Sequence, residues 1–244
     1  MIRTLLWLML ATAIALTARA SDPSALWHIV HDRCVPDEQM HHDPAPCAAV
    51  DPAGGYAVLK DLVGNTQFLL LPTARVGGIE DKAILAPDAP NYFADAWAAR
   101  SYVNQRAGRD LPRDDLALAI NSIYGRTQDQ LHIHIDCIRA DVRDALARHA
   151  AAIGPRWAEF PVPLAGRHYR AMRLAQPELA GTNPFRLLAA DVPQAQMGSH
   201  TLVLTGAGFD GRPGFILLDD RADLAAGDNG SGESLQDHGC ALAR

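Results

Sequence analysis

In the stretch QLHIHIDCI, residues 130–138, polar and apolar side chains alternate strictly from Gln130 to Cys137. Such alternation predicts a β-strand, because successive side chains of a strand point to opposite faces. The apolar set, which must face the core, is Leu131, Ile133, Ile135 and Cys137. The set on the other face is Gln130, His132, His134 and Asp136.

Strands and helices are also predicted on both sides of this stretch. Residues 56–63 and 66–71 alternate loosely around Gly64-Asn65, a tight-turn signal, and predict an antiparallel hairpin. The other expected strands are 116–121, 201–205 and 214–218, and the expected helices are 24–31, 91–108, 141–153, 185–190 and 234–243. The fold class that follows is α+β, an antiparallel sheet with packed helices and a C-terminal extension.

Two histidines on one face of a strand suit phosphoryl or nucleotidyl transfer. Neutral imidazole attacks phosphorus and leaves readily from a phosphoramidate. His132 and His134 lie about 7 Å apart along the strand, which places both rings around one phosphate. Two other interpretations remain open: exposed surface histidines, and a zinc site completed by Asp136 or by a distant histidine. A chelator distinguishes the metal site, because it would abolish the activity of a zinc enzyme.

The N-terminal residues have the pattern of a secretory signal. Arg3 precedes an apolar stretch over residues 4–17, and Ala18-Arg19-Ala20 provides small residues at the positions that a signal peptidase reads. We expect cleavage after Ala20; an uncleaved segment would instead hold the protein at a membrane. The protein is therefore expected outside the cytoplasm, in the periplasm, either soluble or associated with the inner membrane.

Export changes the interpretation of the four cysteines. An oxidising compartment and an even count favour disulfides over thiols. Cys34 and Cys47 enclose the shortest loop, which leaves Cys137 to pair with Cys240. No C-x-x-C motif is present to favour a zinc site.

Length and charge limit the other possibilities. The chain has 244 residues and a formal net charge of -6. A broad basic surface is therefore not expected, which argues against a nucleic-acid partner. We divide the chain into a signal or membrane segment (1–20), a disulfide-pinned region (21–55), a catalytic core (56–155) and a C-terminal region (156–244).

The stretch LAINSIYGRTQDQLHIHID, residues 118–136, resembles the signature of the histidine-triad superfamily, as does FLLLPTAR at 68–75. Its three triad positions match Gln130, His132 and His134, although the first is Gln rather than His. The resemblance implies that His132 is the nucleophile and that His134 contacts phosphate oxygens. It also implies that the Gln130 amide orients the nucleophile, and that Asn121 and Thr127 bind phosphate or ribose.

Four further stretches resemble the CDP-diacylglycerol pyrophosphatase family: YAVLKDLVG (56–64), LAINS-x-x-GRTQ (118–128), HIHI-x-CIR-x-DVR (132–143) and QDH-x-C (236–240). This implies hydrolysis of CDP-diacylglycerol to CMP and phosphatidate through a nucleotidyl-histidine, without a metal or another cofactor. The implied partners are the lipid substrate and a membrane surface, and a homodimer is left open. The alternatives are a broader nucleotide hydrolase or CMP transferase, and an exported module that binds a metal or nucleotide without turnover.

A register slipped by two residues would make His134 the nucleophile and put Asp136 beside the phosphate, where its charge would repel the substrate, so we prefer His132. The Gly-rich run at residues 225–234 predicts an exposed loop, and the cations Lys60 and Arg126 are assigned to the solvated surface. The candidates for a lipid groove are Phe185, Leu187, Leu188 and Met197, each of which could equally belong to the core.

Overall fold

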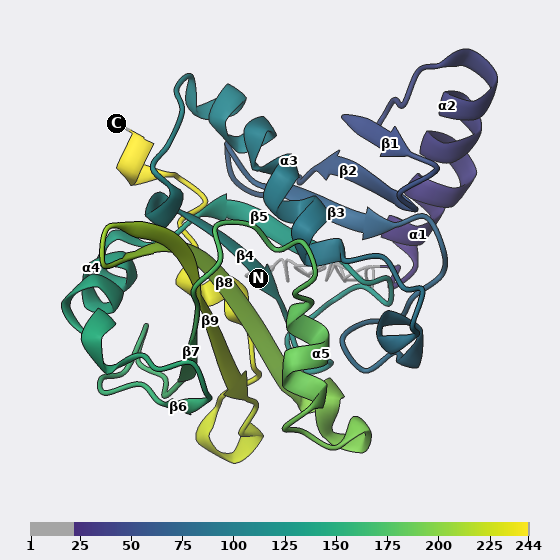
Figure 1. Cartoon of the computed structure of the whole chain (residues 1–244). Helices are drawn as coiled ribbons and strands as arrows, with labels where there is room; N and C mark the ends of the chain where they lie inside the picture. The colour runs from purple at the N-terminus through teal and green to yellow at the C-terminus, as the bar shows by residue number, and fades with distance from the viewer. Residues whose placement is uncertain (1–21, 244) are drawn as a thin grey trace, which may run out of the picture.

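The computed structural model describes residues 22–243, so the expected signal at residues 1–20 lies outside the described residues. Within them, no helix is both long and apolar enough to cross a membrane. Nine strands form one open antiparallel sheet in the order β1-β2-β3-β5-β4-β8-β9-β7-β6 (Figure 1). The expected α+β class with an antiparallel sheet is confirmed.

The strands are β1 (Ala49–Asp51), β2 (Tyr56–Lys60), β3 (Phe68–Pro72), β4 (Leu116–Ile120), β5 (Ile133–Cys137), β6 (Ala158–Glu159), β7 (Arg170–Leu174), β8 (His200–Phe209) and β9 (Arg212–Arg221). The α-helices are α1 (Ala25–Ile29), α2 (Val35–His41), α3 (Tyr92–Ala107), α4 (Ala140–Arg148) and α5 (Pro184–Ala189). A π-helical turn, η1 (Val30–Cys34), joins α1 to α2, and short 3-10 turns include η6 (Leu224–Ala226), η7 (Gly232–Leu235) and η8 (Ala241–Ala243).

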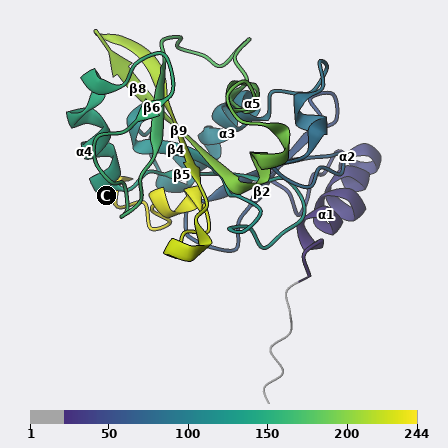
Figure 2. The same cartoon turned by 90° about the horizontal axis from the view of Figure 1, so that it is seen from below.

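The two faces of the sheet are covered differently. One face packs on α3 through a core that includes Phe93 and Trp97. The other face has two covers: α4, through Val142 and Leu146, and the α1–η1 helices, around Val30. Figure 2 shows α1 and α4 at opposite ends of the molecule. The candidate site lies on this second face, between the two covers.

Helix α3 follows its sequence pattern closely. The Asn91 side chain accepts a hydrogen bond from the Ala94 backbone, and Gly108 ends the helix in the left-handed conformation with φ 71°. An asparagine at the start of a helix and a left-handed glycine after its end are both common helix caps. The expected helix over residues 91–108 is confirmed, as is the short helix at 185–190, which is α5.

The N-terminal region is more helical than expected. The sequence predicts a helix over residues 24–31 only, but helical structure continues through η1 to the end of α2 at His41. Pro36 lacks a backbone N–H, so it cannot bond to the carbonyl four residues earlier. The chain widens into the π-turn η1, in which the Val35 N–H bonds to Val30 O. The Cys34–Cys47 disulfide, expected from the sequence, fixes this turn.

The hairpin of β2 and β3 is present, but its turn is not the tight Gly64-Asn65 turn that we expected. Pairing begins at Lys60 opposite Phe68, so residues 61–67 form a longer loop. The side chains of Thr66 and Gln67 are used by the site instead: Thr66 bonds to Asp136, and Gln67 bonds to His134. Thr66 and Gln67, which a tight hairpin would place in the second strand, therefore lie in the loop.

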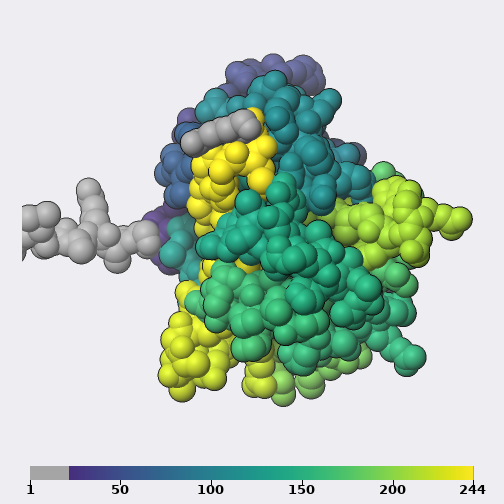
Figure 3. Space-filling view, turned by 90° about the vertical axis from the view of Figure 1, so that its left-hand side faces the viewer, coloured from purple at the N-terminus to yellow at the C-terminus, as the bar shows by residue number. Residues whose placement is uncertain are grey.

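The C-terminal region extends the same sheet and then returns to the candidate site. β8 pairs with β4, and β8 and β9 form a long hairpin. The expected helix at 234–243 is wrong, because this segment contains only the turns η7 and η8. Gln236 forms a β-bridge to Ile138, and Cys240 forms a disulfide with Cys137. These two contacts hold the segment extended against β5, so it does not form a continuous helix. Figure 3 shows the segment lying across the molecular surface.

The end of the Gly-rich run is not the exposed loop that the sequence predicted. Gly232 and Leu235 are buried, and Ser231 and Glu233 are half-buried. A side chain at Gly232 would collide with Thr201 of β8, so glycine allows the segment to lie directly on the sheet. We call residues 231–240 the C-terminal strap.

Candidate active site

A cavity of about 590 Å³ opens between the α1–η1 helices and the C-terminal strap. The sequence-predicted residues Asn121, Thr127, His132 and His134 line it, and Glu233 lines it with them. Thr127 is exposed at its wall, while Asn121 and both histidines are buried. Four predicted residues are thus brought together in one cavity.

His132 is held in a defined tautomer. Its Nδ1 lies 2.6 Å from the backbone oxygen of Gln130. A carbonyl oxygen only accepts, so the ring hydrogen is on Nδ1 and Nε2 carries the lone pair. Burial, and then the neighbouring His134, lower the pKa of His132 to about 4. The ring is therefore neutral at pH 7 and can act as a nucleophile.

Gln130 orients His132 differently from what the sequence predicted. The amide was expected to contact the ring, but the backbone carbonyl of the same residue does so. The Gln130 amide nitrogen donates to Pro72 O and Ala74 O, and its oxygen accepts from the Val76 N–H. The physical reason is that strand pairing starts only at Ile133, so the amide satisfies the backbone of the loop after β3 instead.

His134 is held from both sides. Nε2 of Gln67 lies 2.6 Å from its Nδ1, and because an amide nitrogen only donates, the ring hydrogen is on Nε2. That Nε2 lies 2.9 Å from a carboxylate oxygen of Glu233. The rings of His132 and His134 meet edge to face with centroids 4.9 Å apart. The two imidazoles therefore differ at Nε2: that of His132 has a lone pair, and that of His134 has a hydrogen and faces Glu233.

Glu233 is a site residue that the sequence analysis missed. The same carboxylate oxygen that faces His134 also accepts a hydrogen bond of 2.8 Å from Asn121. Burial alone would raise the pKa of Glu233, but contacts with His134, Asn121 and His238 outweigh it and hold the pKa at about 2. An anion thus already occupies the point where two predicted phosphate donors converge.

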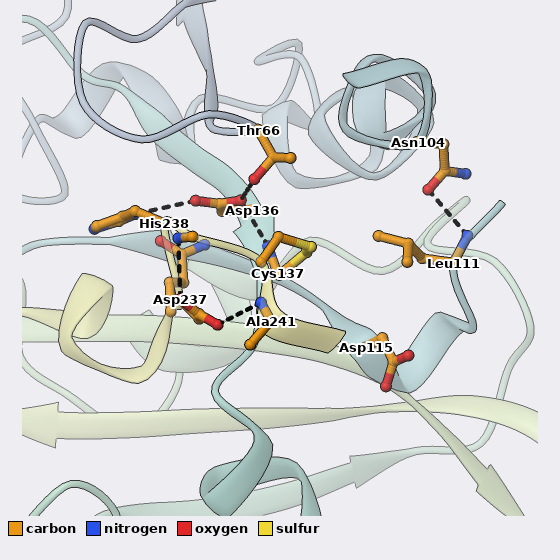
Figure 4. Close-up of a disulfide and its surroundings, with 12 residues drawn as sticks. Thr66, Asn104, Leu111, Asp115, Asp136, Cys137, Asp237, His238 and Ala241 are labelled. Atoms are coloured by element: carbon orange, nitrogen blue, oxygen red, sulfur yellow. Dashed lines mark hydrogen bonds and ion pairs between the residues drawn. A yellow bond between two sulfur atoms is a disulfide. The ribbon is translucent and has the colours of Figure 1, made fainter. Parts of the chain in front are cut away.

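Asp136 does not join the cavity. It is fully buried, accepts from Thr66 Oγ1 at 2.6 Å, and lies 2.9 Å from Nδ1 of His238 (Figure 4). The hydrogen bond to Asp136 raises the pKa of His238. Asp136 therefore anchors the C-terminal strap to β5.

Over residues 22–243, no group of three His, Cys, Asp or Glu side chains is arranged to hold a metal.

Comparison with known proteins identifies the family of the chain. A family model described as CDP-diacylglycerol pyrophosphatase matches residues 21–244. The chain belongs to this family. A CDP-diacylglycerol pyrophosphatase of Yersinia pestis is 43% identical over 238 residues, which is 97% of this chain and 91% of that protein. The predicted family is confirmed, and the relation to the histidine-triad superfamily stays a prediction.

Among the cations that line the cavity of this CDP-diacylglycerol pyrophosphatase family member, Arg126 is neutralised by a carboxylate. The Arg126 side chain is only 7% exposed rather than solvated as expected, and both of its terminal nitrogens bond to Glu80 at 2.7 Å. Lys60 donates to the backbone oxygens of Asp61 and Gly64 and so stabilises the loop. Lys60 keeps its charge, and the exposed Arg33 of η1 is a third cation in the cavity lining.

Proposed function

We propose that this chain hydrolyses CDP-diacylglycerol to CMP and phosphatidate through a covalent cytidylyl-histidine on His132. Family membership supports the substrate. The observation that carries the mechanism is the bond from His132 Nδ1 to the Gln130 carbonyl, which leaves the Nε2 lone pair for attack. By contrast, Nε2 of His134 carries the hydrogen, which favours His132 over the slipped register.

The reaction has two displacement steps. Nε2 of His132 attacks the phosphorus of the CMP half and forms a P–N bond. The bond from that phosphorus to the bridging oxygen breaks, and phosphatidate leaves with the electron pair. Water then attacks the same phosphorus, the P–N bond breaks, and CMP leaves with the water oxygen. The water protons pass to solvent and the product phosphates, and His132 returns to its starting state.

The neighbouring donors act on the phosphate oxygens. His134 Nε2–H and Asn121 Nδ2–H converge on one point, as their shared contact with Glu233 shows. Preorganised donors of this kind stabilise the charge that develops in the transition state. Thr127, at the exposed wall of the cavity, provides a hydroxyl for the ribose or the phosphate.

Glu233 must leave this point before a phosphate can take it. A carboxylate and a phosphate cannot share the same two donors, and their like charges repel. A group with a pKa of about 2 is also a poor general base near neutral pH. The substrate phosphate therefore replaces Glu233 on His134 and Asn121, and Glu233 holds both donors in place until then.

Glu233→Gln is expected to lower the KM for CDP-diacylglycerol roughly tenfold, with kcat changed much less, because it removes a competing charge. Steady-state CMP release measures both constants. Glu178→Gln, an exposed carboxylate outside the cavity, serves as the matched control. A large loss of kcat with an unchanged KM would instead assign Glu233 to the water-attack step.

The pH dependence follows from the pKa of His132. Only the neutral ring attacks, and it is neutral above its pKa of about 4. We expect kcat/KM to stay level from pH 7 to about pH 5 and to fall as the pH passes through about 4. Circular dichroism at each pH separates titration from unfolding. An acid limb near the ordinary histidine pKa of about 6.5 would contradict this assignment.

The decisive experiment is mass spectrometry of protein quenched in alkaline denaturant during turnover of CDP-diacylglycerol, because the P–N bond of a nucleotidyl-histidine hydrolyses in acid. We expect a CMP adduct in wild type and in His134→Ala, and none in His132→Ala. An adduct that is lost only in His134→Ala would support the slipped register. CMP release in the presence of EDTA is expected to match release without it, and inhibition by EDTA would favour the zinc alternative.

Export to the periplasm and association with the inner membrane belong to this proposal. Two disulfides fit an oxidising compartment. The division into a pinned N-terminal region, a core and a C-terminal region, and the open question of a homodimer, also stay predictions. Fractionation of cells and the molar mass of the purified chain in solution test them.

A further inference from the structure

The cavity has an apolar part that the catalytic proposal leaves unused. Besides the polar residues, its walls are formed by Leu26, Ile29, Pro46, Leu59, Leu62, Val63 and Leu69. These come from α1, from the segment closed by Cys34–Cys47, and from β2, β3 and the loop between them. The N-terminal region therefore forms one wall of the cavity that holds the histidines.

Strand register places the apolar part directly beside His134. His134 pairs with Leu69 of β3, and Leu69 pairs with Leu59 of β2. Paired residues point to the same face, and neighbouring strands lie about 4.8 Å apart, so Leu69 is one strand from the histidine and Leu59 is two. The surface thus changes from polar to apolar within about 10 Å.

The loop between β2 and β3 forms an exposed apolar rim. Leu62 has a relative exposure of 102% and Val63 of 55%, and both line the cavity. Backbone contacts fix the loop: Lys60 Nζ donates to Asp61 O and Gly64 O, and the Asn65 N–H donates to His238 O. The two side chains are therefore held in solvent at the opening by a structured loop. Large apolar side chains exposed in this way mark an interaction surface.

The size of the cavity limits what it can enclose. A volume of about 590 Å³ is typical of a site for one drug-sized molecule. It accommodates a nucleotide headgroup and the start of a lipid, but not two complete acyl chains. The remainder of the chains needs an apolar environment directly outside the opening, and a bilayer provides one.

We propose that the apolar part of this cavity binds the glycerol-proximal part of the substrate's acyl chains, and that Leu62 and Val63 enter the bilayer surface at the opening. The inference rests on the proposed function, since it assigns a place to the lipid half of that substrate. The lipid-groove candidates from the sequence lie elsewhere, in the hydrophobic core. Phe185, Leu188 and Met197 are fully buried core residues, and Leu187 packs against the same core.

The test compares two substrates: CDP-diacylglycerol in phosphatidylcholine vesicles, and CDP-glycerol, which has the same headgroup and no acyl chains. The variant is Leu62→Asp with Val63→Asp. We expect its kcat/KM for the vesicle substrate to fall at least roughly tenfold, and that for CDP-glycerol to stay within about twofold of wild type. Binding to the same vesicles, measured by co-sedimentation, is expected to weaken in parallel.

Leu224→Asp is the matched control, because Leu224 is 59% exposed on η6 and does not line the cavity. It is expected to behave as wild type on both substrates. Wild-type kinetics of the double variant on vesicles, or an equal loss on both substrates, would overturn the inference. Hydrolysis of CDP-diacylglycerol but not of CDP-glycerol by wild type would support it, by showing that the chains are needed. If wild type releases CMP from neither, the proposed function itself fails.

Discussion

Replacing His132 by alanine is expected to reduce CMP release from CDP-diacylglycerol by roughly 10⁴-fold or more, the scale seen when a covalent nucleophile is removed. The Nε2 lone pair of His132 is the nucleophile that the tautomer makes available, and Nε2 of His134 bears a hydrogen. The measurement is kcat/KM for CMP release, with the fold checked by circular dichroism.

His134→Ala provides the comparison. It removes one of two converging donors and leaves Asn121, so we expect a smaller loss, roughly 10² to 10³-fold, as for the removal of a single oxyanion donor. His168→Ala, an exposed histidine outside the cavity, is expected to retain full activity. A His134 variant that loses more than the His132 variant would reverse the two assignments.

The local sequence pattern predicts a strand or helix correctly where the spacing of apolar residues and the residues at the ends of the element agree. The alternation in residues 130–138 predicts that Ile133 and Ile135 face the core, and both lie in the core that packs on α3. The helix expected over residues 91–108 is α3, which Asn91 caps at its start and Gly108 ends. These features depend on neighbouring residues in the sequence, which is why a single sequence reveals them.

Features that depend on distant contacts were missed. Gly64-Asn65 predicts a tight turn with Thr66 in the next strand, but Thr66 lies in the loop and bonds to Asp136, 70 positions away. Gln130 looked like a third triad side chain, yet its amide serves the loop at residues 72–76. Neither partner is visible in the local sequence.

The position of Glu233 beside the catalytic strand could have been predicted from the expected cysteine pairing. It lies in a Gly-rich run without periodicity, so its local sequence indicates only a loop. The expected Cys137–Cys240 bond, however, already places the residues before Cys240 beside the catalytic strand. In the structure this bond, together with the Gln236–Ile138 bridge, brings Glu233 to His134. The disulfide was therefore the signal for a site residue one hundred positions from the motif.

The same disulfide carries the second large effect. Cys137→Ala with Cys240→Ala is expected to lower the free energy of unfolding by about 3–5 kcal/mol, because the bond closes a loop of 103 residues. Removing Cys34–Cys47, with a separation of 13, is the matched control and is expected to cost about 3 kcal/mol or less. Guanidinium unfolding of wild type and of the two disulfide variants, under one condition, ranks their free energies of unfolding.

Activity should separate the two bonds as well, because each one fixes a different wall of the cavity. Cys240 anchors the strap, whose Gln236 amide donates to the backbone oxygens of Ala117 and His134. Loss of that anchor is expected to reduce hydrolysis of both CDP-diacylglycerol and CDP-glycerol. Loss of Cys34–Cys47 loosens only the apolar wall, so it is expected to reduce hydrolysis of the lipid substrate selectively. If the two variants lose both substrates equally, the cavity does not divide into a catalytic wall and a lipid wall.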